Sequence, residues 1–275
     1  MSSLRELKRR IAAISGTHQL TQAMRMVSVS KYNRALALHR AYQPYKAQCD
    51  RLLQALGGAS LSEARPLRRV LYVLITGNRG LCGVYNQELL RHLRRELARQ
   101  EAPWKLIICG KWGQENAADL PFTPYTLPDI PDSRQSAELA RLLLEAYRSG
   151  EADEVYFVYQ EFHNVLVQEP VCRRLLPMQA PAEEADTGES FLYVPDRETL
   201  REAIARRVLC GQVYAWLLSA ATGMHGATMT TMRAAADNSG AMLEELTLHM
   251  NQLRQNAITT QVLEVSGAAL QEEQA

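Results

Sequence analysis

The strictest pattern in the sequence is an apolar repeat near its C-terminal end. Between residues 229 and 260, small or apolar side chains recur at alternating spacings of three and four residues. In order, these positions are Met229, Met232, Ala236, Ser239, Leu243, Leu246, Met250, Leu253, Ala257 and Thr260. A mean spacing of 3.5 residues is typical of helices that pair in a left-handed coiled coil. The pattern therefore requires a second long helix as its partner.

The sequence offers that partner at the opposite end of the chain. The same alternating spacing joins Leu4, Leu7, Ile11 and Ile14. We expect the repeat to slip around residues 15–17 and to resume with Leu20, Met24 and Val27. The pattern predicts one long N-terminal helix and one long C-terminal helix that pack against each other as a coiled coil.

Further signals mark the ends of the two long helices. The N-terminal helix should continue to the glycine pair at residues 57–58, with a kink at Pro44. Asp196 is placed to act as the N-cap of the C-terminal helix, because aspartate accepts hydrogen bonds from the first free N–H groups of a helix. Residues 179–190, QAPAEEADTGES, are acidic and rich in turn-forming residues, which predicts a surface loop.

The middle of the chain alternates between strands and helices. Buried strands are predicted for RVLYVLIT, KLIICG and EVYFVYQEF, and a helix for SAELARLLLEAYRSG. The stretch VLVQEPVCRRLL should add an edge strand, because Pro170 cannot donate a hydrogen bond within a central strand. Strands that alternate with helices indicate parallel strand–helix–strand units, as in doubly wound α/β folds.

A glycine-rich turn, ITGNRGLCG at residues 75–83, joins a predicted strand to a helix. Such a turn can bind phosphate at the helix N-terminus. The spacing of Gly77, Gly80 and Gly83 differs from the dinucleotide and P-loop patterns, so we favour a structural turn with positive φ and close backbone approach. The alternative, a nucleotide-binding α/β protein, predicts that substitution of Gly80 abolishes nucleotide binding. Cys82 is a possible nucleophile, but a packed thiol is the more common role.

The charge of the chain is nearly balanced overall and uneven locally. The formal net charge is +1, which does not indicate binding to nucleic acid. Up to residue 46, however, there are nine lysines or arginines and one acidic residue, Glu6. A nucleic-acid adaptor is one reading of this basic helix and predicts binding that weakens steeply with salt. Aromatic residues for base stacking are nearly absent there, so we favour a solvated face or one that meets a protein partner.

Catalytic and metal-binding patterns are not evident. The five cysteines are scattered and never spaced C-x-x-C, which favours free thiols in a reducing compartment. The six histidines are dispersed, and no acid–base couple can be identified. We therefore expect no catalytic residues, no metal and no cofactor. The start of the sequence has no apolar leader segment, and no stretch is long enough for a membrane span, so we expect a cytosolic protein.

Three stretches together resemble one known family. They are TQAMRMVSVSKYNRA at residues 21–35, VLITGNRGLCGVYN at residues 73–86, and DNSGAMLEELTLHMNQLRQNAITTQVLEVSGAAL at residues 237–270. The sequence is similar over essentially its whole length to the gamma subunit of F-type ATP synthase, in its bacterial form. The resemblance implies an N-terminal coiled-coil helix at 1–58, a Rossmann-like α/β foot at 66–195 and a C-terminal coiled-coil helix at 196–275, the two helices being antiparallel.

The resemblance also implies a function. Members of this family are non-catalytic rotor shafts that couple proton-driven rotation of the membrane c ring to conformational changes in the catalytic beta subunits. The implied partners are three alpha and three beta subunits, the epsilon subunit and the c ring, with membrane contact only through these partners. The implied location is the cytoplasmic side of the bacterial cell membrane, as a peripheral protein.

Roles for individual residues follow from the same resemblance. Arg254, Gln255 and Thr259 match the positions that hydrogen-bond the catch loop of a beta subunit. Met24 and Met26 match the helix face beneath the acidic hinge loop of the beta subunits, and Tyr193 matches a part of the foot near the c ring. This sequence departs from the family pattern at Met224, Thr228, Ala236 and the Gly77-Asn78 pair, where the resemblance implies altered polar contacts.

Overall fold

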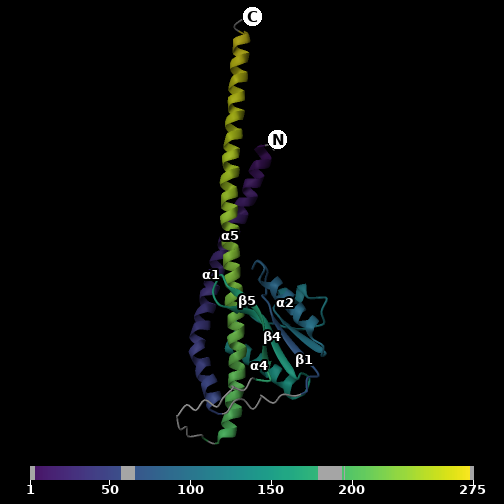
Figure 1. Cartoon of the computed structure of the whole chain (residues 1–275). Coiled ribbons are helices and arrows are strands. Elements are labelled where there is room, and N and C mark those ends of the chain that lie inside the picture. The colour runs from purple at the N-terminus through teal and green to yellow at the C-terminus, as the bar shows by residue number, and fades with distance from the viewer. Residues whose placement is uncertain (1–3, 57–65, 179–193, 195, 273–275) are drawn as a thin grey trace. The chain divides into compact units, whose positions relative to one another are not determined.

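The computed structural model describes residues 4–56, 66–178, 194 and 196–272. Its elements, in chain order, are α1 (Leu4–Ala55), β1 (Val70–Ile75), α2 (Tyr85–Arg99), β2 (Trp104–Cys109), α3 (Lys111–Asn116), β3 (Thr123–Tyr125), α4 (Ser133–Arg148), β4 (Glu154–Phe162), β5 (Gln168–Leu176) and α5 (Arg197–Glu272) (Figure 1). They form two compact units, which we call the helix-pair unit (Met1–Val27 with Thr230–Ala275) and the sheet unit (Ser28–Met229).

The sheet unit contains one five-stranded sheet with the strand order β3-β2-β1-β4-β5. β1 lies parallel to both β2 and β4, and β2 lies parallel to β3. β5 pairs antiparallel with β4 at the edge of the sheet and carries Pro170, as the sequence predicts. The short strand β3 and the six-residue helix α3 were not predicted, because each is too short to show a periodic apolar pattern.

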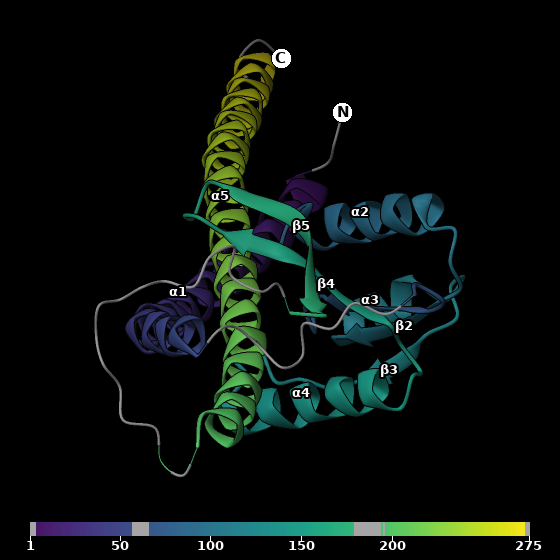
Figure 2. The same ribbon diagram turned by 60° about the horizontal axis from the view of Figure 1, so that its bottom comes forward.

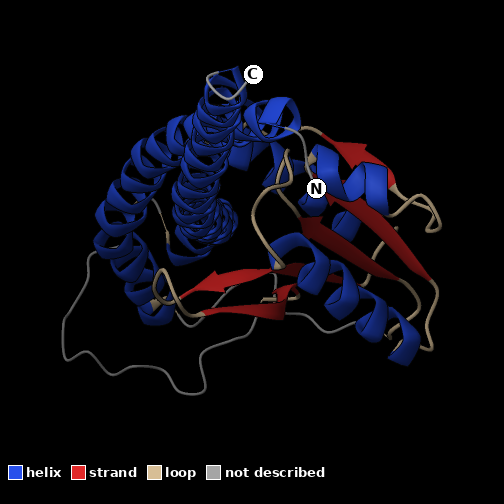
Figure 3. Ribbon diagram, turned by 90° about the horizontal axis from the view of Figure 1, so that it is seen from above, coloured by secondary structure: helices blue, strands red, loops and turns tan. Residues whose placement is uncertain are grey.

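The sheet is covered by helices on both faces. Every side chain of β1 is buried, as expected for a parallel strand with a core on either side. On one face Val73 and Phe157 pack with residues of α4, α5 and α1. On the other face Leu74 packs with α2 residues such as Leu89 and Leu93. Figure 2 shows α2 and α4 on opposite sides of the sheet, and Figure 3 shows the strands flanked by helices.

Local sequence signals explain the helices of the sheet unit. Asp132 begins α4 with a capping box, in which its carboxylate accepts from the Gln135 backbone N–H at 2.8 Å and the Gln135 side chain accepts from the Asp132 N–H at 3.2 Å. Asp196 caps α5 as predicted, and its carboxylate accepts from the Thr199 N–H at 2.8 Å. The helix α1 continues through Pro44 without a break.

Within the sheet unit α1 and α5 run antiparallel. Near one end of their contact, a Cβ on Gly226 would lie 3.5 Å from the ring of Tyr32. Near the other end, the rings of Tyr42 and Tyr214 meet edge to face with centroids 4.8 Å apart. Because residue numbers rise along α1 while they fall along α5, the two helices pass each other in opposite directions. The predicted fold class, an α/β sheet domain with long antiparallel N- and C-terminal helices, is confirmed.

Some predictions concern residues outside those that the structure describes. They are the acidic loop at 179–190, the glycine pair at 57–58 and Tyr193. The division of the chain into segments 1–58, 66–195 and 196–275 also stays a prediction, because the two compact units cut across both long helices.

Candidate functional site

The helix-pair unit displays the apolar repeat of α5. Met232 and Ala236 are each 3% exposed. The positions that continue the repeat, Ser239, Leu243, Leu246, Met250 and Leu253, are partly buried. The neighbouring positions 241, 242, 244, 245, 247, 248 and 249 are exposed. The buried side of α5 therefore follows the spacing of a coiled-coil helix through Leu253.

The N-terminal half of the helix pair differs from the prediction in one respect. Leu7 is 2% exposed, and Leu4, Ile11 and Ile14 are partly buried. The predicted slip around residues 15–17 is wrong: Leu20 is 60% exposed and Val27 is 56% exposed, whereas Thr21 is buried.

The physical reason is that the three–four spacing continues without interruption from Ile14 to His18 and Thr21. The buried positions there are polar, and an apolar pattern cannot reveal them. The Thr21 hydroxyl donates to the His18 backbone carbonyl at 2.9 Å, so it can be buried without losing a hydrogen bond.

His18 makes the polar contact between the two helices of this unit. Its Nδ1 lies 3.0 Å from both the Ala236 carbonyl oxygen and the Ser239 hydroxyl, and its Nε2 lies 2.8 Å from the Gln22 side-chain nitrogen. The Gln22 nitrogen can only donate, so Nε2 accepts and Nδ1–H is the donor to Ala236. A Cβ on Gly240 would lie 3.4 Å from the imidazole, so glycine leaves room for the ring. A polar contact between the helices of a coiled coil favours one register over the others.

The far end of α5 is exposed. All side chains from Arg254 to Leu263 are exposed, including Ala257 and Thr260, which continue the repeat. This stretch holds the three predicted catch-loop residues, Arg254, Gln255 and Thr259. The Thr259 hydroxyl donates to the Gln255 backbone carbonyl at 3.0 Å, and the Gln255 side chain is exposed.

The remaining predicted contact residues lie on α1 or outside the described chain. Met24 is partly buried and Met26 is 66% exposed. Tyr193 lies outside the described residues. The exposed end of α5 therefore brings three of the predicted contact residues together within two helical turns, and Met26 lies elsewhere in the same unit.

The glycine turn lies in the sheet unit and is held by protein groups. The Gly77 N–H donates to the Asn86 side-chain oxygen at 3.0 Å, and the Asn86 amide nitrogen donates to the Arg79 carbonyl at 3.3 Å. Gly83 has a φ of 62°, and a Cβ on Gly77 would lie 2.5 Å from the Met224 sulfur. Glycine is not required at position 80, because its φ is not positive and a Cβ there would lie at an ordinary 3.8 Å from the Trp112 ring. These contacts favour a structural turn.

The chemistry of Cys82 agrees with that reading. Its side chain is 4% exposed, and burial raises the pKa of its thiol. A nucleophilic cysteine needs the opposite shift, because only the thiolate attacks. The Asn86 amide also donates to the Cys82 sulfur at 3.3 Å. Cys82 is therefore a packed residue of the turn.

The carboxyl ends of β1 and β2 are tied together where doubly wound folds bind ligands. The Thr76 hydroxyl donates to the Cys109 carbonyl at 3.0 Å and accepts from the Gly113 N–H at 3.1 Å. Gly110 has a φ of 102°, and a Cβ there would lie only 2.2 Å from the Thr76 carbonyl oxygen. Thr76 and Gly110 therefore pack closely between the two strand ends.

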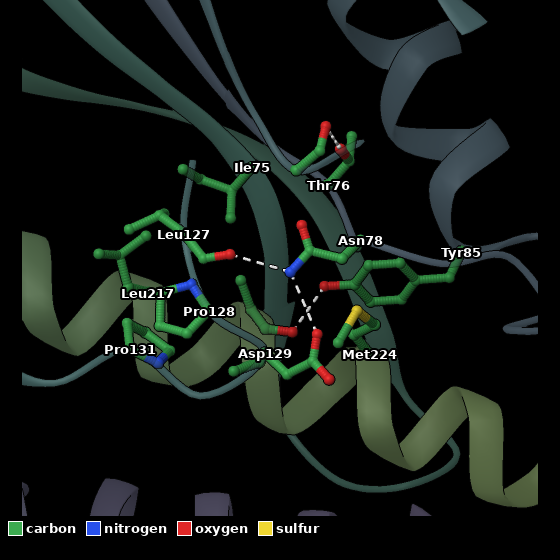
Figure 4. A pocket seen from close by; sticks show the side chains of 14 residues that line it. Ile75, Thr76, Asn78, Tyr85, Leu127, Pro128, Asp129, Pro131, Leu217 and Met224 are labelled. Carbon is green, nitrogen blue, oxygen red and sulfur yellow. Dashed lines mark hydrogen bonds between the residues drawn. The ribbon is translucent and has the colours of Figure 1, made fainter. Parts of the chain in front are cut away.

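A polar cluster next to these strand ends joins four segments of the sheet unit, and Figure 4 shows its members Asn78, Leu127 and Asp129. The Asn78 amide donates to the Leu127 carbonyl at 2.9 Å and to the Asp129 carboxylate at 3.1 Å. Lys31 on α1 forms an ion pair with the same carboxylate, and His225 Nε2 on α5 lies 3.2 Å from the Asp129 carbonyl. Local sequence patterns could not reveal this cluster, because the Lys31–Asp129 contact spans 98 positions of the chain.

The cluster has a defined protonation state near neutral pH. Burial alone would raise the pKa of Asp129, but hydrogen bonds from Lys31 and Asn78 outweigh it and hold that pKa below its usual value. Burial lowers the pKa of His225, so its imidazole is neutral near pH 7. Asp129 is therefore an anion that fastens α1 and the turn after β1 to one loop of the sheet unit.

The cavity next to the cluster has a volume of about 30 Å³, room for roughly one water molecule. Tyr85 and Met224 line it, and the Tyr85 hydroxyl donates to the Ala220 carbonyl at 2.8 Å.

In the described part of the chain no three His, Cys, Asp or Glu side chains are grouped to hold a metal ion. No helix among the described residues could span a membrane.

Comparison with known proteins gives a consistent result. Residues 3–270 match the model of a family described as ATP synthase. The ATP synthase gamma chain of Moorella thermoacetica is 36% identical, and the match covers 98% of this chain and 99% of that one. The ATP synthase gamma chain of Desulfitobacterium hafniense is 34% identical with the same coverage. A chain in the rotor of the Euglena gracilis mitochondrial ATP synthase shares the fold, with a TM-score of 0.68 at 18% identity over 93% of this chain and 98% of that one.

Proposed function

The chain belongs to the family of ATP synthase gamma chains, and we propose that it is the central rotor shaft of a bacterial F-type ATP synthase. The observation that carries the proposal is the match of the whole chain to bacterial gamma chains, together with a helix pair built from its two ends. In this function the chain itself is not catalytic. It transmits rotation of the membrane c ring to the catalytic beta subunits.

The mechanism rests on asymmetry. One shaft cannot touch three equivalent catalytic subunits in the same way, so each subunit meets a different set of side chains. A contact that favours one conformation of a beta subunit over another by about 1.4 kcal/mol changes nucleotide affinity tenfold. When the shaft turns, these preferences pass from one beta subunit to the next, and ATP is made or hydrolysed in sequence.

The exposed end of α5 supplies the polar contacts of this proposal. Arg254, Gln255 and Thr259 would hydrogen-bond the catch loop of one beta subunit. In the described residues the Arg254 guanidinium has no carboxylate partner, so its five donors are available to a neighbouring chain. Arginine suits this contact because its donors are held in a fixed plane.

Apolar and basic residues of α1 supply a second contact. Met24 and Met26 would lie beneath the hinge loop of the beta subunits, where a flexible thioether can adapt as each subunit passes. The excess of lysine and arginine up to residue 46 would face the acidic residues of that loop. The coiled-coil seam, formed by the α1 and α5 residues described above, would keep the two helices turning together.

The sheet unit would form the foot. We propose that it contacts the epsilon subunit and the c ring, with Tyr193 near the ring. The protein would then lie on the cytoplasmic side of the bacterial cell membrane and touch the membrane only through these partners. No bound cofactor is needed for this function.

The test is reconstitution with the cognate alpha and beta subunits, followed by native mass spectrometry. We expect one copy of this chain with three alpha and three beta subunits, and ATP hydrolysis that depends on it. The double substitution Arg254→Ala and Gln255→Ala should leave assembly intact and lower the turnover rate. Arg134→Ala, which removes an exposed side chain from α4, is the matched control and should have no effect. A chain that stays outside an assembled alpha–beta ring would refute the proposal.

A further inference from the structure

A second heptad stripe lies on α1 inside the sheet unit. We call it the outer stripe, and it consists of Leu38, Ala41, Tyr45, Gln48 and Leu52. The spacing alternates between three and four residues, as in the seam of a coiled coil. All five side chains are exposed, and the three large ones are exposed by 37%, 45% and 42% for Leu38, Tyr45 and Leu52.

The outer stripe lies beside the face of α1 that contacts the rest of the sheet unit, and the centroid of its Tyr45 ring lies 5.5 Å from the centroid of the Tyr42 ring on that face. The contacting face carries Ala35, Tyr42 and Cys49, which follow a spacing of seven residues along the helix. Figure 2 shows this part of α1 on the opposite side of α5 from α4, where no other described element covers its outer face. A single exposed leucine needs no explanation, but a regular row over two heptads is typical of a helix-binding surface.

Near the outer stripe, α1 carries arginines that form no ion pair within the described chain. Arg34, Arg40 and Arg51 are exposed on α1, and no carboxylate of the described chain pairs with them. Arg207 on α5 lies close enough to Tyr45 for its charge to act on the phenol. The neighbouring carboxylates form ion pairs with other residues: Asp50 pairs with Lys46, and Glu202 pairs with Arg206 and Arg148.

We propose that the outer stripe is the docking surface for an amphipathic helix of a partner protein. Apolar side chains of that helix, spaced by three and four residues, would cover Leu38, Tyr45 and Leu52. Acidic side chains on its flanks would pair with the unpaired arginines. The occupant is a different protein and not a second copy of this chain, because two copies would bring arginines against arginines.

The proposed function assigns the epsilon subunit and the c ring to the sheet unit as a whole, but it assigns no partner to this face of α1. The outer stripe lies in the sheet unit, apart from the exposed end of α5 that would meet the beta subunits. A partner helix could bind there or leave without any change to the seam of the helix pair.

Photocrosslinking in the cells that normally make the protein tests the proposal. The full-length chain carries p-benzoylphenylalanine at position 38, 45 or 52, one position at a time. The matched control carries it at Gln43, which is exposed on another face of the same helix. We expect positions 38, 45 and 52 to crosslink to one segment of a single partner, and the control to give at least tenfold less product. Mass spectrometry of the product must show a segment with apolar residues at three–four spacing and flanking Asp or Glu.

A charge reversal gives a second measurement. Arg34→Glu combined with Arg51→Glu should reduce the crosslink yield from position 45 about tenfold, whereas Arg34→Lys with Arg51→Lys should retain it. Crosslinks to a second copy of the chain, to its own residues 179–190 or to a segment without acidic flanks would overturn the proposal. So would the absence of crosslinks at all three positions. Because the readout is in whole cells, it does not depend on reconstitution of the ATP synthase, and either proposal can fail alone.

Discussion

Substitution of three glycines by alanine separates backbone strain from crowding in the sheet unit. Gly150 has a φ of 76° with open space around it, so alanine should cost only the left-handed conformation, about 1–2 kcal/mol. Gly110 has a φ of 102° and a Cβ would lie 2.2 Å from the Thr76 carbonyl oxygen. Strain of about 1–3 kcal/mol and overpacking of about 1–3 kcal/mol then add, and we expect Gly110→Ala to cost about 2–6 kcal/mol.

Gly77→Ala should cost about as little as Gly150→Ala, but for a different reason. The obstacle there is the Met224 sulfur at 2.5 Å, and a methionine side chain can move. We expect a cost of about 1 kcal/mol, which Met224→Ala should reduce in the double variant because the two sites share one contact.

The assay is urea unfolding followed by tryptophan fluorescence. The three tryptophans, Trp104, Trp112 and Trp216, all lie in the sheet unit, so the signal reports the unfolding of that unit alone. The free energies of unfolding should fall in the order wild type, then Gly77→Ala and Gly150→Ala, then Gly110→Ala. If Gly110→Ala and Gly150→Ala were equally stable, the close approach of Gly110 to Thr76 would not be a constraint on the turn.

Three further outcomes are expected. Asn78→Ala removes hydrogen bonds to Leu127, Asp129 and the Lys111 N–H, and should lower the free energy of unfolding of the sheet unit by about 1–3 kcal/mol in the same urea assay. Burial lowers the pKa of His225 and of His39, so the unfolded chain binds more protons than the folded one below pH 6.5. Stability should therefore fall as the pH drops from about 7 through 6.5 towards the lowered folded-state values, and His225→Gln should flatten that fall in thermal unfolding curves; an unchanged slope would contradict the assignment of His225. His18→Leu should leave the helix pair as stable or raise its stability by about 1 kcal/mol, measured by circular dichroism, since the Ser239 hydroxyl still donates to Ala236 at 3.0 Å; a large loss would show that the polar contact is needed for pairing itself.

Periodicity predicted most of the fold. The strand from Val70 to Ile75 is a continuous apolar run, and the strand from Glu154 to Phe162 contains one from Val155 to Tyr159, which is why their burial could be anticipated. The edge position of β5 followed from Pro170, and the start of α5 from Asp196. These features depend on side chains close together in the sequence, so local patterns suffice to find them.

The parts that were missed depend on contacts between distant residues. Thr21 in the helix pair is polar and buried only because α5 lies against it, so an apolar repeat pointed instead to Leu20 and Val27. Asp129 contacts Lys31, Asn78 and His225, which come from three other segments. No pattern of neighbouring residues in the sequence marks any of them as part of a cluster. The glycine turn was correctly anticipated as a class of structure, yet sequence alone could not show that Gly80 has room for a side chain while Gly77 does not.

The pairing of the two chain ends also determines when each part of the molecule can form. His18 contacts Ala236 across 218 positions of the chain, so closing that loop directly is entropically costly. Once the sheet unit has folded, Tyr32 and Gly226 are neighbours, and the loop still to be closed shrinks to about two dozen residues, which lowers its closure cost by about 2 kcal/mol. We therefore expect the sheet unit to fold first and the coiled coil of the helix pair to form last. During synthesis the first helix would leave the ribosome without its partner and wait for nearly the whole chain to be made.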